Sequence, residues 1–189
     1  INTSDFEEGM INHAINLHQK GNIKEAEKYY KYCINQGVND QRVFYNYGII
    51  LRTLSKLREA EYSQRKAIEL NPFFLNAHIN LGNILRDLGK LDEAENSQRK
   101  AIELNPESFE AYSNLAIILK DLGKLREAEN FQMKAIKLKS DSAELYFNLA
   151  SIYKESGKLK KSESSLYKAI LLNPEYAEAY LYLSFLELL

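Results

Sequence analysis

The sequence lacks the features that mark several classes of protein. It has one cysteine, Cys33, so no disulfide can form within the chain, and we expect a reducing compartment such as the cytoplasm. No apolar run approaches the roughly 20 residues that a membrane-spanning helix needs, and no signal-peptide pattern occurs, so we predict no membrane partner. The 25 basic and 26 acidic residues give a net charge of −1, without the basic excess typical of nucleic-acid binding, so no nucleic-acid partner is predicted.

Residue patterns that support catalysis or metal binding are also missing. None of the three histidines, His13, His18 and His78, has a second ligand at metal-binding spacing. No glycine-rich phosphate loop, nucleophile elbow or zinc-binding helix motif occurs. Cys33 stands where later segments have alanine, so we interpret it as a small buried residue rather than a nucleophile. We therefore predict no enzyme, no catalytic residue, no metal site and no cofactor.

What the sequence does contain is an internal repeat. The segment LGNILRDLGKLDEAENSQRKAIELNP begins at Leu81, and close copies begin at Tyr47 and Leu115, at an offset of 34 residues each time. Because no linker or low-complexity stretch interrupts the pattern, we predict a single domain over residues 1–189. Its five units and the terminal helix that follows them are 7–40, 41–74, 75–108, 109–142, 143–176 and 177–189.

Each unit is predicted to form two helices. In the third unit, apolar residues recur at helical spacing from Ala77 to Leu88, and Gly89 supplies a stop because glycine adopts the left-handed conformation that ends a helix. The second helix ends at Asn105, because the proline that follows disfavours helical geometry there. Small residues recur where two helices would pack closely: Ala14, Gly48, Gly82, Ala116 and Ala150 in first helices, and Ala26, Ala60, Ala94, Ala128 and Ser162 in second helices.

This pattern resembles the tetratricopeptide repeat family. The shared features are the 34-residue period, the leucine–small pair, the closing proline, and alanines at Ala67, Ala101, Ala135 and Ala169. The resemblance implies an all-α fold, a right-handed α-solenoid of five helix–turn–helix repeats plus a terminal helix. First helices would line a concave groove and second helices the convex back. Where the family has an aromatic in the second helix, this chain has Tyr30 and then Gln64, Gln98, Gln132 and Leu166, so the glutamines form either a satisfied amide row or a wetter seam.

An asparagine occupies the same position of the first helix in all five units: Asn12, Asn46, Asn80, Asn114 and Asn148. Asparagine is a mediocre helix former, so its recurrence at mid-helix needs a reason. Inheritance by duplicated repeats, or a structural amide contact between adjacent helices, would explain it without a ligand. The functional alternative is an amide ladder that binds the backbone of an extended polypeptide, because one amide offers both donors and an acceptor. The sequence is similar to the repeats of the O-linked N-acetylglucosamine transferase, in which such a row holds substrate polypeptides.

Charged residues accompany the asparagines at groove-facing positions. The basic row consists of Arg52, Arg86, Lys120 and Lys154, and its acidic neighbours are Asp87, Asp121 and Glu155. Adjacent opposite charges on one helix are equally typical of a solvated face. A glutamate that recurs in second helices, at Glu27, Glu61, Glu95, Glu129 and Glu163, is also expected at a solvated position. We predict a peptide-binding site made of the asparagine row, Asn83 and the basic row, with Asn80 and Asn114 central.

Other readings of the family resemblance stay open. The branch that grips the carboxylate terminus of chaperone partners is not predicted, because its lysine sites carry Ile11 and Asn76 here and its arginine site carries Asn80. One alternative function is the substrate-presenting arm of a larger transferase whose catalytic domain lies outside these residues. Another is a self-assembly scaffold, a homo-oligomer formed through Ala177–Leu189, because that segment is apolar with few charges. We expect that further residues cover this end in a longer natural chain.

Overall fold

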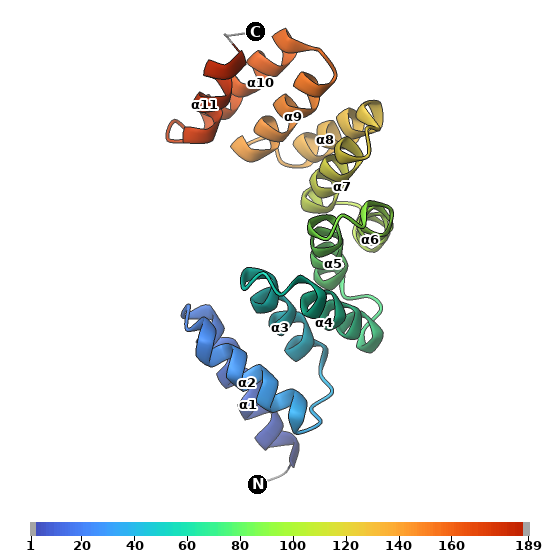
Figure 1. The fold of residues 1–189 in the computed structure, drawn as a ribbon, viewed down its shortest axis with the longest axis vertical. Coiled ribbons are helices and arrows are strands. Elements are labelled where there is room, and N and C mark those ends of the chain that lie inside the picture. Colours follow the sequence, from blue (N-terminus) through green and yellow to red (C-terminus); the bar gives the residue numbers. More distant parts are fainter. Residues whose placement is uncertain (1–2, 187–189) are drawn as a thin grey trace. The chain divides into compact units, whose positions relative to one another are not determined.

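The computed structural model describes the backbone of residues 3–186 and the side chains of residues 6–186. Over this range the chain forms eleven α-helices and no strand, so the all-α prediction is confirmed. Figure 1 shows these helices in their order along the chain. The helices are α1 (Thr3–Gln19), α2 (Ile23–Asn35), α3 (Gln41–Thr53), α4 (Leu57–Leu70), α5 (Leu75–Asp87), α6 (Leu91–Leu104), α7 (Phe109–Asp121), α8 (Leu125–Leu138), α9 (Ala143–Glu155), α10 (Leu159–Leu172) and α11 (Ala177–Leu186).

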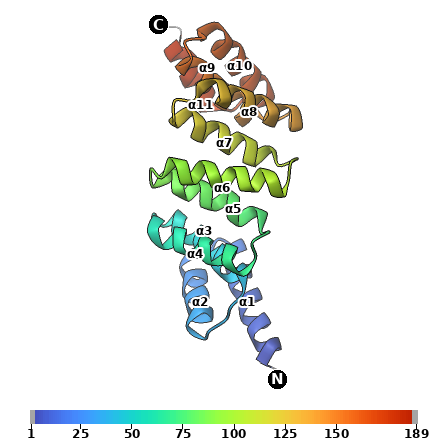
Figure 2. The same ribbon diagram turned by 90° about the vertical axis from the view of Figure 1, so that its right-hand side faces the viewer.

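The helices group into two compact units, residues Ile1–Lys90 and Leu91–Leu189. Within each unit every helix packs against the next one along the chain, as α1 with α2 and α9 with α10 in Figures 1 and 2. First helices of successive repeats also contact one another, α1 with α3 and α3 with α5 in the first unit and α7 with α9 in the second. Each unit therefore presents a face made of first helices, on which the predicted site residues lie.

Local sequence signals set the helix ends. Gly89 has a φ of 74°, and the Lys90 backbone N–H donates to Leu85 O at 2.8 Å, the bond that closes a left-handed helix cap. The predicted stop is therefore confirmed. The same corner of the second repeat has Ser55 with a φ of 58°, a conformation that a side chain disfavours. At the other end of the third repeat, α6 ends at Leu104, and the Asn105 side chain accepts from the Glu107 N–H at 3.0 Å.

The small residues of the pattern lie where helices meet. Ala14, Ala60, Ala116 and Ala150 are fully buried, as predicted, and Ser162 is buried with its hydroxyl donating to Ala150 O at 2.8 Å. Cys33 is also buried, and burial raises the pKa of its thiol. Close packing of helices at these positions places larger apolar side chains around them in the core of each unit.

The three in-register glutamines are fully buried, so they form an amide row rather than a wetter seam. Gln64 Nε2 donates to Tyr45 O at 2.9 Å, and Gln132 Nε2 donates to Leu145 O at 2.7 Å. The Gln132 Oε1 accepts from the Ser113 hydroxyl at 3.1 Å, whereas Oε1 of Gln64 and Oε1 of Gln98 find no hydrogen-bond partner among the described residues. The row is therefore satisfied at one of its three positions.

Candidate functional site

The asparagines of the first unit lie at mid-helix on α1, α3 and α5, and each already has a partner. Asn12 Nδ2 donates to Glu8 Oε1 at 3.1 Å, and Asn46 Nδ2 donates to Arg42 O at 2.8 Å. Asn80 makes a hydrogen bond to the Tyr45 phenol, which partly offsets the rise that burial imposes on the pKa of that group. Since an amide offers two N–H donors and two acceptor lone pairs, these contacts leave each side chain with capacity for a ligand.

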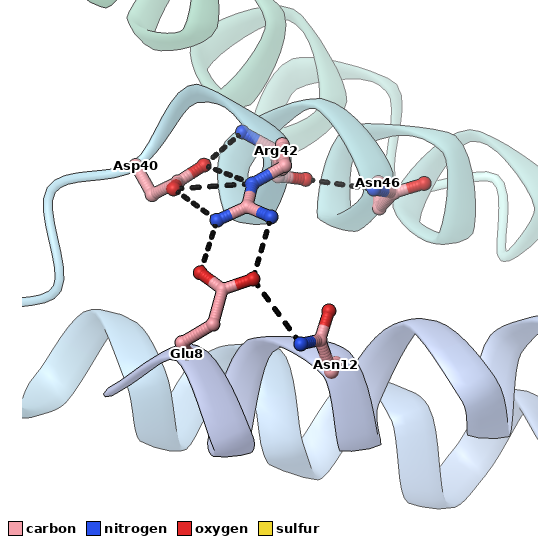
Figure 3. Close-up of polar contacts among 5 residues, drawn as sticks. All are labelled: Glu8, Asn12, Asp40, Arg42 and Asn46. Atoms are coloured by element: carbon pink, nitrogen blue, oxygen red, sulfur yellow. Dashed lines mark hydrogen bonds and ion pairs between the residues drawn. The ribbon is translucent and has the colours of Figure 1, made fainter. Parts of the chain in front are cut away.

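An ion-pair network surrounds Asn12 and Asn46, as Figure 3 shows. The Arg42 guanidinium donates to both oxygens of Glu8, at 3.0 and 2.7 Å, and thereby joins α3 to α1. Asp40 holds the same guanidinium and also accepts from the Arg42 N–H at 2.7 Å, which caps α3. Hydrogen bonding from Arg42 lowers the pKa of the Glu8 carboxyl. The sequence analysis did not predict this pair, although Glu8 and Arg42 carry opposite charges at the same position of consecutive repeats.

The two asparagines of the second unit differ in their surroundings. Asn148 Nδ2 donates to the Ser113 hydroxyl at 3.3 Å, and Ser113 donates in turn to Gln132. Asn148 therefore ties α9 to α7 and α8, which is the structural amide contact considered as an alternative. Asn114 is half-buried, and its side chain makes no hydrogen bond to the part of the chain that the structure describes. Its whole amide remains available.

The charged rows pair with each other across consecutive first helices. Arg52 Nε donates to Asp87 Oδ2 at 2.8 Å in the first unit. In the second unit Lys120 Nζ lies 3.4 Å from Glu155 Oε1 and donates to the Ser151 hydroxyl at 3.1 Å. Lys154 lies over the Tyr182 ring, 5.0 Å from its centroid. Asn83 and Arg86 are half-buried, and each has an interaction partner of its own. Two members of the basic row, Arg52 and Lys120, are thus paired with acidic side chains of the next first helix.

A cavity of about 450 Å³ lies between α3, α4 and α5 of the first unit. It brings together two predicted site residues, Asn80 and Arg52, with Asp87 and the buried Gln64. Ile49 of α3 and Ile84 of α5 supply its apolar walls. The cavity therefore combines aliphatic surface with a few polar groups, the composition typical of ligand-binding pockets.

The recurring glutamates of the second helices correct the expectation of a solvated row. The side chains of Glu27, Glu61, Glu95 and Glu129 are only 12–16% exposed. Each accepts from the lysine that opens the second helix of the next repeat, and the four lysines are Lys56, Lys90, Lys124 and Lys158. Sequence reasoning missed this contact because the two partners stand 29 residues apart. The row joins successive repeats and leaves the first-helix face as the candidate site.

Other features bear on the remaining predictions. Among the described side chains, no group of three or more His, Cys, Asp or Glu residues is placed to hold a metal ion. No helix in the described range is long and apolar enough to cross a membrane.

On α11, Tyr180, Leu181 and Phe185 are 48%, 58% and 54% exposed. The last three residues of the predicted terminal helix, 187–189, lie outside the described residues. Self-association through this helix stays a prediction.

Comparison with known families decides the identity of the repeat. The profile of the cilia and flagella-associated protein 70 middle TPR-like domain matches residues 12–139, and a tetratricopeptide repeat profile matches residues 143–176. The chain belongs to the tetratricopeptide repeat family. Such repeats mediate protein–protein interaction and are generally non-catalytic. No curated protein sequence matches the chain, and similarity to the transferase repeats stays a prediction.

Solved structures share the tetratricopeptide fold at low sequence identity. TTC0263, a thermophilic TPR protein of Thermus thermophilus, is 18% identical, with a TM-score of 0.79 over 97% of this chain and 100% of that chain. MamA of Desulfovibrio magneticus RS-1 is 19% identical, with a TM-score of 0.80 over 90% and 97%. YrrB, described as a TPR protein with an unusual peptide-binding site, is 22% identical, with a TM-score of 0.73 over 90% and 88%.

Proposed function

We propose that this chain binds an extended polypeptide on the first-helix faces of its units, through the amides of the asparagine row. The proposal is based on the hydrogen-bonding capacity that these amides still have for a ligand. Asn46 and Asn80 in the first unit and Asn114 in the second are half-buried. Arg52 and Lys120 are paired with Asp87 and Glu155, so the neutral amides are open hydrogen-bonding groups on the first helices of each unit. Such groups bind a peptide backbone whatever its side chains are.

Asn80 and Asn114 supply one amide from each unit and are the best residues for a test. Asn148 is unsuitable, because its contact with Ser113 is structural and its loss would disturb the packing of α7 and α9. The similarity to YrrB supports a peptide ligand for this fold. It does not bear on the asparagine row itself, which depends on the contacts described above.

The test is selection from a displayed library of unstructured peptides. We expect the wild-type chain to enrich peptides, and the Asn80→Ala, Asn114→Ala double variant to bind them about 10-fold to 100-fold more weakly, since each amide hydrogen bond contributes about 1 kcal/mol. The matched control is Asn96→Ala, Asn130→Ala, which removes two exposed amides from the second helices α6 and α8. Absence of enrichment, or equal binding by the double variant with unchanged helicity, would refute the proposal.

A further inference from the structure

The guanidinium of Arg52 keeps most of its hydrogen-bonding capacity for a ligand. A guanidinium carries five N–H donors, and Arg52 uses the one on Nε, which donates to Asp87 Oδ2 at 2.8 Å. Its Nη1 and Nη2 groups have no partner among the described residues, and 41% of the side chain is exposed. The donors on both Nη groups are therefore open to an incoming acceptor.

Arg42, on the same helix α3, shows that one guanidinium of this chain can hold two carboxylates at once. Its Nε donates to both oxygens of Asp40, at 3.1 and 3.2 Å, while Nη1 and Nη2 donate to the two oxygens of Glu8, at 3.0 and 2.7 Å (Figure 3). Hydrogen bonding from Arg42 lowers the pKa of the Glu8 carboxyl, so the second carboxylate is favoured in its charged form. Arg52 makes the first of these two contacts, with Asp87, and no described residue makes the second.

The groups around Arg52 fit a carboxylate on a short aliphatic stem. Arg52 and the exposed Ser55 line the cavity of about 450 Å³ together with the half-buried Asn80. The Ser55 hydroxyl has no partner among the described residues, and a hydroxyl can donate to a carboxylate oxygen. Ile49 and Leu57, both half-buried, also line the cavity and offer apolar surface to the methylene groups of the stem.

We infer that this cavity is a subsite for an aspartate or glutamate side chain of the bound polypeptide, held by the Nη groups of Arg52 while Nε keeps Asp87. The inference depends on the proposed function, because a chain whose backbone is bound by the asparagine amides presents its side chains to a neighbouring cavity. A lysine or arginine side chain does not fit, since it would bring a second cation beside Arg52 and leave the Nη donors unused. A carboxylate can accept from both Nη groups, which is the strongest pairing open to a guanidinium.

The first experiment is a titration of the ¹⁵N-labelled full chain with N-acetylglutamate N-methylamide, followed by NMR. We expect shifts concentrated in the Arg52 Nε–H signal and in the backbone of 49–57 and 80–87. The isosteric N-acetylglutamine N-methylamide, which carries no charge, should bind about tenfold more weakly. Equal binding of the glutamine compound overturns the subsite. Equal or stronger binding of N-acetylalanine, whose carboxylate is a chain terminus rather than a side chain, also overturns it.

Three variants test the assignment to Arg52. Arg52→Gln should bind the glutamate compound about tenfold more weakly, and Arg52→Lys should recover part of this loss, because an ammonium keeps the charge without the two parallel hydrogen bonds. Asp87→Asn should bind it about threefold more tightly, because asparagine still accepts from Nε but carries no competing charge. The matched control Arg58→Gln removes the same charge from an exposed side chain of α4 and should bind as the wild type does. Unchanged binding by Arg52→Gln, or weaker binding by Asp87→Asn, overturns the subsite.

The second experiment compares the peptides that wild type and Arg52→Gln select from the library. We expect one position of the peptides enriched by the wild type to hold aspartate or glutamate, and we expect this preference to disappear with Arg52→Gln. Enrichment without a preferred acidic position would overturn the subsite and leave the proposed function standing. Binding of the glutamate compound at Arg52 with no peptide enrichment would support the subsite and refute the proposed function.

Discussion

Adding one methyl group at Gly48 should test how closely the buried Gln64 side chain packs against this position. A Cβ at this residue of α3 would lie 2.5 Å from Gln64 Nε2 and 3.0 Å from its Cδ. In Gly48→Ala the Gln64 side chain must therefore turn away and lose its bond to Tyr45 O. An unsatisfied buried amide costs about 1–3 kcal/mol. Alanine recovers about 1 kcal/mol over glycine in a helix, so we expect a net loss of about 1 kcal/mol in the free energy of unfolding.

The effect should change sign when Gln64 is replaced. In the fifth repeat Ala150 and Leu166 stand at the equivalent positions, and both are fully buried. In a Gln64→Leu background, Gly48→Ala recreates that pair, so only the helix-propensity gain remains, and we expect up to about 1 kcal/mol of stabilisation. The difference between backgrounds is then about 2 kcal/mol, well beyond the additivity error of roughly 0.5 kcal/mol.

Urea unfolding of the wild type, both single variants and the double variant, followed by far-UV circular dichroism, measures this difference. Gly9→Ala is the matched control, because nothing lies within 4 Å of a Cβ there and the same substitution should be neutral or stabilising. If Gly48→Ala has the same effect in both backgrounds, Gln64 is not what the glycine accommodates, and the reasoning about the amide row is wrong.

Two further predictions concern the corners and the joints between repeats. Ser55→Gly should raise the free energy of unfolding by about 1 kcal/mol, because Ser55 alone among the described non-glycine residues has a positive φ; an unchanged urea midpoint would contradict this. Hydrogen bonds from Lys56 and Lys31 lower the pKa of Glu27 in the folded chain, so their stabilisation is present at neutral pH and is lost as the pH falls below about 4. Glu27→Gln should therefore cost about 1 kcal/mol at pH 7 and much less near pH 3, and thermal melts showing a pH-independent cost would refute it.

Much of the fold could be predicted because its signals are local. The stop at Gly89 and the end of a helix at Asn105 follow from backbone preferences of one or two residues, and both are observed. The candidate site was harder to predict from the sequence. Asn114 and Asn148 occupy the same position of their repeats. The Asn114 side chain has no hydrogen bond within the described residues, whereas Asn148 donates to the Ser113 hydroxyl. The difference depends on the residue that a neighbouring helix brings close, here 35 positions away.

The sequence by itself determined the period, the helix pairs and the column of asparagines, because helix formation and capping depend on neighbours within a few residues. Only the tertiary structure decided which polar groups are already satisfied. It paired Arg52 with Asp87, made the supposedly solvated Glu61 a half-buried partner of Lys90, and left Gln64 Oε1 without a donor among the described residues. Hydrogen bonding and burial depend on groups that meet in space, and in a repeat protein those groups come from the next repeat along the chain.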